Sequence, residues 1–301
     1  MPGQAREDKS FSNNFLIDTE TQSQLNHSQM KNLSWILRTM LLGALSVVST
    51  CANERYFGYT YEPETMVKGD LEYEQWVTLR AGRNKTVGQD HYNLWEFRHE
   101  LEYGVTDNYT VSLYLNESLE NFREVESGHN ISDFRFDGVS LENRFMVLNP
   151  AEHSVGLSLY LEPRFGGHDS ELEEKIIIGQ RHGDWKWALN LTHATEWSRN
   201  FHETEGEVEV SFGITRRLNP RWSVGLEARD HNELPEYKTW ENTAFYLGPV
   251  VTYQRSKWWA TFTVMPQVVG ANFEENVDGN HSLELEGHER WNIRLIVGFS
   301  F

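Results

Sequence analysis

Apolar and polar residues alternate along most of this chain, and the alternation is what most constrains its fold. In the segment RWSVGLEAR (221–229), every second residue from Trp222 to Ala228 is apolar, and the residues between them are small, polar or charged. A period of two is that of a β-strand with one oily face. No convincing amphipathic helix follows residue 53, so the pattern predicts an all-β protein.

Segments of this kind recur almost end to end, and we expect twelve of them, at residues 69–82, 91–105, 108–125, 133–148, 154–167, 171–183, 185–199, 205–218, 221–234, 240–255, 257–270 and 290–301. The connections after even-numbered segments are tight, and those after odd-numbered segments are usually longer. An even strand number with short turns on one side and long loops on the other is typical of transmembrane barrels of the outer-membrane kind. We therefore expect an antiparallel transmembrane β-barrel of about 12 strands, with both termini in the periplasm. The alternative is a soluble β-sandwich or secreted barrel whose oily faces pack together.

The chain ends on one of these segments, RWNIRLIVGFSF (290–301), and its last residue is aromatic. Phe299 and Phe301 lie on the oily face, and Ile296 is the one large apolar residue on the polar face. Closure of the last strand against the first removes the sheet edge and turns the oily face to lipid. A C-terminal phenylalanine matches the signal that barrel-assembly machinery reads, so we expect Phe299 and Phe301 to form an assembly signal.

The N-terminal residues predict export. Residues 1–29 are polar and patternless, and we interpret them as an extension upstream of a second possible start at Met30. Residues 30–52 combine a positive region, an apolar stretch and small residues for cleavage near Ala52, as a secretory signal peptide does. The uncharged stretch within it is too short for a membrane-spanning helix.

After this signal peptide, residues 53–68 are expected to form a periplasmic segment or a plug of the lumen, and residues 69–301 the barrel. The formal net charge of −18 at pH 7 excludes binding of nucleic acid through a basic field, and it would attract cations. The single cysteine, Cys51, would leave with the signal peptide, so no disulfide framework is expected. The expected location is the bacterial outer membrane, with membrane lipid, lipopolysaccharide and the assembly machinery as partners and with no cofactor.

Recurring aromatic and acidic motifs fill several of the expected strands, including LEYGVTDNYTVSLYLN (101–116), FDGVSLENRF (136–145) and LYLEPRFG (159–166). Together with residues 57–83, these segments resemble an uncharacterised family of Gram-negative outer-membrane β-barrel proteins. The resemblance implies the fold and the location. It implies no activity, so no functional residue is transferred from it.

The polar faces of the expected strands carry many charges, which would line the lumen: Glu72, Glu74, Arg80, Glu96, Arg98, Glu100, Glu142, Arg144, Glu162, Arg164, Glu207, Glu209, Glu227, Arg229 and Arg294. Such charges must be hydrated or paired. Twelve strands lie between small filled barrels and open porins, so a narrow lumen is expected. The sequence favours a narrow passive pore or transport protein for small solutes, with a bias toward cations. The alternative is a closed lumen, braced by Arg–Glu pairs, in a structural or surface-binding barrel.

The longer loops carry histidine or acidic residues, and the histidines among them are His91, His129, His168, His202, His231, His281 and His288. Imidazoles and carboxylates that converge at one mouth could bind a transition metal such as zinc or copper. No tight spacing of ligands supports this hypothesis. The alternative is a solvated acidic surface that meets lipopolysaccharide through divalent ions.

An enzyme is the third possibility, because some outer-membrane barrels cleave lipids. Pairing across the turn at Gly183 and Asp184 predicts that Glu174 lies opposite His193, both facing lipid. A carboxylate beside a histidine is half of a hydrolase site. No outward serine accompanies the pair, so we expect a polar pair at the membrane interface and no enzyme activity.

Overall fold

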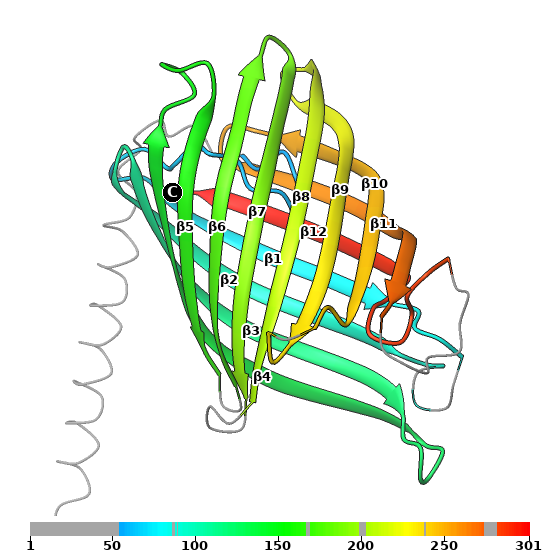
Figure 1. The fold of residues 1–301 in the computed structure, drawn as a ribbon. Helices are drawn as coiled ribbons and strands as arrows, with labels where there is room; N and C mark the ends of the chain where they lie inside the picture. The colour runs from blue at the N-terminus through cyan, green and yellow to red at the C-terminus, as the bar shows by residue number, and fades with distance from the viewer. Residues whose placement is uncertain are drawn as a thin grey trace, which may run out of the picture. The chain divides into compact units, whose positions relative to one another are not determined.

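The computed structural model describes residues 54–85, 88, 90–166, 169–198, 203–237, 239–273 and 282–301, in which twelve strands form a closed antiparallel barrel (Figure 1). The expected N-terminal extension and signal peptide lie outside the described residues. The strands are β1 (Leu71–Ala81), β2 (Asn93–Thr106), β3 (Tyr109–Arg123), β4 (Asn130–Leu148), β5 (Gly156–Phe165), β6 (Asp169–His182), β7 (Trp185–Ser198), β8 (Glu203–Asn219), β9 (Trp222–Pro235), β10 (Asn242–Gln254), β11 (Trp258–Asn272) and β12 (Trp291–Ser300). Each strand pairs with the next, and β12 pairs with β1. The part of the chain that the structure describes contains no helix long and apolar enough to cross a membrane.

The predicted twelve-stranded antiparallel barrel is confirmed, and every strand begins and ends within three residues of its expected position. The expectation that connections are short after even-numbered strands and longer after odd-numbered strands does not hold everywhere. The connection from β5 to β6 covers only residues 166–168, because the two strands stay paired up to Phe165 and Ser170. It is therefore shorter than the connection from β4 to β5, which covers residues 149–155.

Apolar side chains cover the outside of the barrel, and this arrangement excludes the soluble sandwich. Leu159 on β5 is 49% exposed and Leu226 on β9 is 52% exposed, although both belong to regular strands. Their strand neighbours Ser158 and Glu227 turn inward and are buried. The oily faces therefore do not pack against one another, and the polar faces surround a common interior.

Ile296, the apolar residue on the polar face of β12, contributes to a small core inside the barrel. It packs in a buried cluster with Trp76 of β1 and Trp259 of β11. The indole of Trp259 lies against Gly298, where a β-carbon would be only 2.3 Å from the ring, and its Nε1 donates a 2.8 Å hydrogen bond to Glu72. The alternation is broken at Ile296 because its side chain completes this buried cluster.

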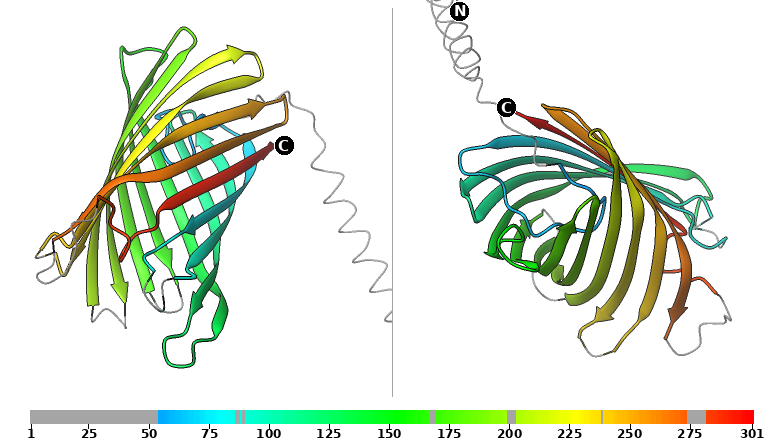
Figure 2. Two further views of the ribbon diagram at one scale, coloured as in Figure 1. Left: turned by 90° about the vertical axis from the view of Figure 1, so that its right-hand side faces the viewer. Right: turned by 90° about the horizontal axis from the view of Figure 1, so that it is seen from above.

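Both ends of the barrel sequence lie at the same end of the barrel. The N–H of Phe301 donates a hydrogen bond to the carbonyl of Leu71, at the beginning of β1. Residues 54–66 enter from this end and lie inside the barrel, where Figure 2 shows them as a blue trace crossing the interior. The barrel wall therefore encloses its own N-terminal segment.

Replacing Gly298 with valine tests the packing of Trp259. Because the added side chain meets the buried indole, we expect the change to lower the free energy of unfolding by about 1–3 kcal/mol. Urea unfolding of the barrel in detergent measures this loss. Val297→Leu, on the outer face of the same strand, is the control and should leave the unfolding midpoint nearly unchanged.

Candidate functional site

Residues 54–66 fill one half of the lumen with aromatic rings. Tyr56, Phe57, Tyr59 and Tyr61 are all buried, and Phe57 is only 1% exposed. Gly213 of β8 makes room for this segment, because a β-carbon there would lie 2.4 Å from the ring of Phe57. The wall is thus shaped to receive the N-terminal segment.

Polar groups of the wall bind the backbone of this segment, which has no strand partner. The carboxylate of Glu227 on β9 accepts hydrogen bonds from the N–H groups of Gly58 and Tyr59, both at 2.9 Å, and of Thr60, at 3.0 Å. The side-chain amide of Asn190 on β7 accepts from the N–H of Tyr61 at 2.6 Å and donates to its carbonyl at 2.9 Å. Buried backbone groups require such partners, so these two side chains fix the path of the segment.

Arg55 carries the charge that the segment brings into the lumen. Its guanidinium lies 2.9 Å from the carboxylate of Glu74 and 3.4 Å from that of Glu100, and all three side chains are buried. The same group lies over the rings of Tyr61 and Trp76, at 4.4 Å and 4.7 Å from their centroids. A cation between two carboxylates and two rings neutralises acidic side chains that would otherwise be unpaired.

A second cation from the wall neutralises the neighbouring acidic pair. Arg144 on β4 contacts Glu102, and its Nε lies 3.3 Å from Glu142, which also accepts a 2.6 Å hydrogen bond from Tyr114. These charged groups are buried too. The half of the lumen that holds residues 54–66 is consequently packed and ion-paired.

Burial affects the pKa values of two carboxyl groups of the inserted segment, Glu62 and Glu64. Burial raises the pKa of Glu62, and Lys186 opposes the rise. Burial also acts to raise the pKa of Glu64, but Lys186, whose Nζ lies 3.0 Å away, holds that pKa below its usual range. Lys186 of β7 therefore attaches the end of the segment to the wall.

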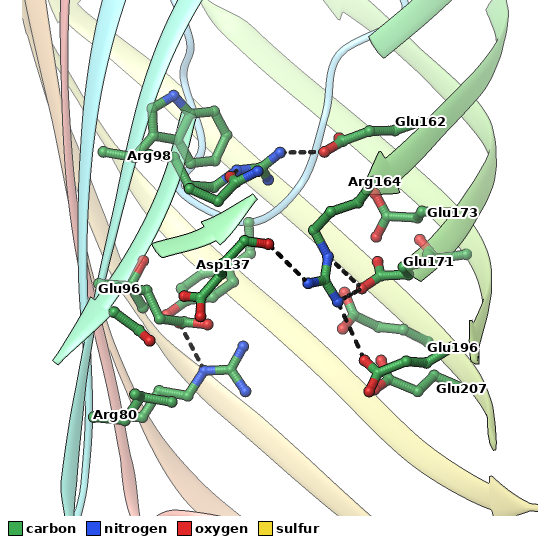
Figure 3. Close-up of a pocket in the computed structure, with 18 of the residues that line it drawn as sticks. Arg80, Glu96, Arg98, Asp137, Glu162, Arg164, Glu171, Glu173, Glu196 and Glu207 are labelled. Carbon is green, nitrogen blue, oxygen red and sulfur yellow. Dashed lines mark hydrogen bonds and ion pairs between the residues drawn. The ribbon is translucent and has the colours of Figure 1, made fainter. Parts of the chain in front are cut away.

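The other half of the lumen contains a cavity of about 460 Å³, with Tyr59 and Tyr61 of the inserted segment among its lining residues. Its walls carry eleven carboxylates against seven arginine and lysine side chains. Figure 3 shows Arg164 of β5 in contact with Glu171, at 2.7 Å, and with Glu196, at 3.2 Å. The acidic groups outnumber their basic partners, so the cavity keeps an excess of negative charge.

All fifteen charged residues expected in the lumen lie on the inner face. Nine of them line the cavity: Arg80, Glu96, Arg98, Glu162, Arg164, Glu207, Glu209, Arg229 and Arg294. The other six are buried around residues 54–66 or in the adjoining layer: Glu72, Glu74, Glu100, Glu142, Arg144 and Glu227. Arg55 was not expected among the lumen charges, because the segment that carries it has no periodic pattern. The aromatic residues next to it were the only sequence feature that indicated its burial.

The structure brings two of the seven predicted metal-binding histidines together. His231 of β9 and His288 of the β11–β12 connection lie with ring centroids 5.2 Å apart. Burial, and then the positive charges around it, beginning with His231, lower the pKa of His288 to about 2. His91 instead contacts Arg123, and His129 is exposed in the β3–β4 connection. His168, His202 and His281 lie outside the described residues.

The predicted pairing of Glu174 with His193 is confirmed, with 3.5 Å between the carboxylate and Nδ1. The hydroxyl group beside Nε2 belongs to Tyr237, at 3.3 Å, which in turn contacts Thr195. Tyr237 lies in the β9–β10 connection with a positive φ of 57°, so pairing rules for strands could not place it. Phe299 and Phe301, the expected assembly signal, are exposed at the end of the barrel sequence.

Comparison with known proteins identifies a family and a fold. A model described as "Family of unknown function (DUF6662)" matches residues 49–177 and 178–301. No curated protein matches the chain. The COG4313 outer membrane channel from Pseudomonas putida F1 is similar in structure, with a TM-score of 0.54, 11% identity, and coverage of 82% of this chain and 100% of that one. The NanC porin gives a TM-score of 0.48 with 9% identity, covering 76% of this chain and 100% of that one.

Replacing Glu227 with alanine should release the inserted segment, because hydrogen bonds to a charged acceptor contribute about 1.5–3 kcal/mol each. We expect a cysteine placed at Thr60, in a Cys51→Ser background, to react with a maleimide at least tenfold faster when Glu227 is alanine. Glu174→Ala, on the outer face, is the matched control. Equal labelling rates in all three proteins would show that other contacts hold the segment.

Proposed function

The chain belongs to the DUF6662 family, and we propose that it is an outer-membrane barrel acting as a narrow passive pore or transport protein with a bias toward cations. The observation that carries this proposal is the acidic cavity of about 460 Å³ inside a closed barrel. The inserted segment narrows the lumen next to this cavity. The solutes would be small cations or small molecules that tolerate a negative lining.

The outer surface supports the membrane location. Large apolar side chains are exposed on most strands, among them Leu113, Phe145, Ile176, Phe212 and Leu247. A soluble protein rarely exposes so continuous an apolar surface, whereas a barrel in lipid requires one. The same proposal includes contacts with lipid and lipopolysaccharide and periplasmic termini. It also includes cleavage near Ala52 and recognition of Phe299 and Phe301 by assembly machinery.

The charge of the cavity supports the cation bias. Its eleven carboxylates exceed its seven arginine and lysine side chains by four. A cleft lined by one sign of charge raises the local concentration of ions of the opposite sign. Rings of acidic side chains give cation channels their selectivity in the same way.

A closed structural or surface-binding barrel is the second candidate, and one observation favours it. The side chains of Glu72, Glu74, Glu100 and Glu142 are 0% exposed, so the layer around the inserted segment is tightly packed. A lipid-modifying enzyme has less support, because His193 contacts a tyrosine hydroxyl group rather than a serine. We therefore propose a non-enzymatic protein.

Conductance of the refolded barrel in a planar bilayer under a potassium chloride gradient tests the pore. We expect small discrete steps with a cation-selective reversal potential. A variant lacking residues 54–66 should conduct several-fold more, because the packed layer loses the segment that fills it. The Glu227→Ala protein releases the same segment less completely, so we expect its conductance to lie between those of the other two proteins.

Silence of the inserted wild-type barrel, together with conduction by the shortened variant, would establish the closed barrel instead. If neither protein conducts, although heat-modifiable migration shows that both are folded, the proposed pore function would be wrong. These outcomes separate the proposal from its alternative.

Neutralising carboxylates of the cavity should weaken the selectivity. In the double variant Glu196→Gln and Glu207→Gln, half of the excess negative charge is removed, so we expect the cation-to-anion permeability ratio to fall at least twofold. The reversal potential measures this ratio. Glu174→Gln, a carboxylate on the outside of the barrel, should leave it unchanged.

A further inference from the structure

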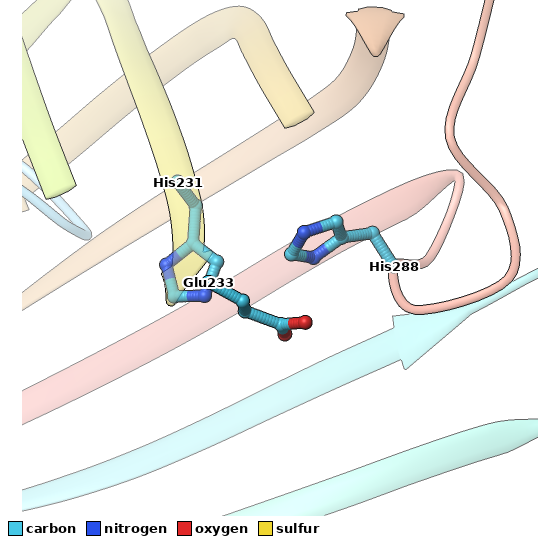
Figure 4. A group of neighbouring side chains, drawn as sticks. All are labelled: His231, Glu233 and His288. Carbon is cyan, nitrogen blue, oxygen red and sulfur yellow. The ribbon is translucent and has the colours of Figure 1, made fainter. Parts of the chain in front are cut away.

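We propose that His231, Glu233 and His288 form a binding site for a divalent transition metal ion, with zinc as the best match. The three side chains each offer a donor atom, and these atoms lie within 4.8 Å of one another (Figure 4). Two imidazoles and one carboxylate are ligands that suit zinc and its neighbours rather than calcium or magnesium. The site is independent of whether the lumen conducts.

The fold brings these residues together from distant parts of the sequence. His231 and Glu233 are two residues apart on β9, so both turn to the interior. His288 comes from the connection between β11 and β12 and approaches the same strand, as Figure 4 shows. The two imidazole rings are almost perpendicular, at 88°.

Surrounding acceptors orient both rings as metal ligands. Nδ1 of His231 lies 3.2 Å from the carboxylate of Glu209, and Nε2 of His288 lies 2.6 Å from the side-chain oxygen of Asn242. When these nitrogens carry the protons, Nε2 of His231 and Nδ1 of His288 present lone pairs to the metal. Histidine ligands are commonly held in this way by a carboxylate or a carbonyl group.

Asn242 joins two of the proposed ligands. Its side-chain nitrogen donates a 2.6 Å hydrogen bond to the carboxylate of Glu233 while its oxygen faces His288. Glu207 lies beside this group, with its carboxylate 3.8 Å from Nε2 of His231, and can supply a fourth donor. The carboxylates of Glu207, Glu209 and Glu233 offset the positive charge of Arg229, which lies 3.1 Å from Nδ1 of His231.

The backbone around His288 is fixed by its own contacts. The carboxylate of Glu284 accepts hydrogen bonds from the N–H groups of Gly287 and His288, at 3.1 Å and 2.9 Å. Gln267 of β11 donates to the carbonyl of Glu284 at 2.6 Å, and Arg83 donates to the carbonyl of Gly287 at 3.0 Å. A site held by such supporting contacts needs little rearrangement to bind its ion.

Another group of possible ligands, Glu72, Glu74 and Glu102, differs in kind. It contains carboxylates only, and Glu74 and Glu102 are already paired with Arg55 and Arg144. The site at His231 combines imidazole with carboxylate and lines the cavity through His231 and Glu233. A bound ion would therefore fasten the β11–β12 connection to the wall of the cavity.

Calorimetric titration of the untagged, refolded barrel with zinc, after treatment with EDTA, tests this site. We expect saturable binding of one ion, and a loss of affinity of at least tenfold in His231→Ala and in His288→Ala. Cobalt as a second probe should give visible absorption bands typical of four-coordinate nitrogen and oxygen ligands in the wild type but not in these two variants. Heat-modifiable migration checks that each variant remains a folded barrel.

His91→Ala and His129→Ala are matched controls, because both remove a histidine from another loop, and they should bind zinc as the wild type does. No zinc binding by the wild type would overturn the proposal. Equal binding by a folded His231→Ala, His288→Ala double variant would overturn it as well, by assigning the ion to other histidines. Neither outcome depends on the conductance measurement.

Discussion

The pairing of β12 with β1 is the constraint on which the rest of this structure depends. Ten residue pairs, from Glu72 with Ser300 to Ala81 with Trp291, join the ends of the sheet. Closure removes the edges and gives every strand one face toward a common interior and one toward the surroundings. Because the alternation is carried through all twelve strands, closure also collects the charged residues of the inner faces into one narrow space. Each of these charges then needs water or a partner.

The inserted segment meets part of that requirement and gives the lumen two different halves. Arg55 pairs with Glu74 and Glu100, while Glu227 and Asn190 bind the backbone of residues 58–61. The wall and the segment are therefore complementary, and the polar groups of this half are used to hold a peptide rather than to conduct ions. In the other half, carboxylates exceed basic groups around an open cavity. Any selectivity for cations arises there, next to the constriction.

The sequence predicts those features that follow from a period of two. Strand positions, inward charges and the pairing of Glu174 with His193 all depend on alternation and on short turns, which are local. The path of residues 54–66 was beyond such reasoning, because it depends on contacts with residues far away, such as Asn190 and Glu227. The meeting of His231 with His288 has the same cause, since the position of a long connection is decided by tertiary hydrogen bonds. The sequence showed only their acidic neighbours, and the expectation that His231 lies in a loop was wrong, because β9 extends to Pro235.

Two elements outside the barrel ladder lie at the cavity: the inserted segment lines it, and the β11–β12 connection contacts residues that line it. Tyr59 and Tyr61 of the inserted segment line it, and so do His231 and Glu233, against which the β11–β12 connection places His288. Strands of a closed barrel share their hydrogen bonds with two neighbours, whereas the contacts of these elements with the wall include many from side chains, such as Glu227 to the inserted segment and Gln267 to the β11–β12 connection. A change in occupancy or charge at either place can therefore alter the cavity without opening the barrel. In the proposed pore, the rigid wall provides the passage, and the elements held by side chains determine how wide that passage is.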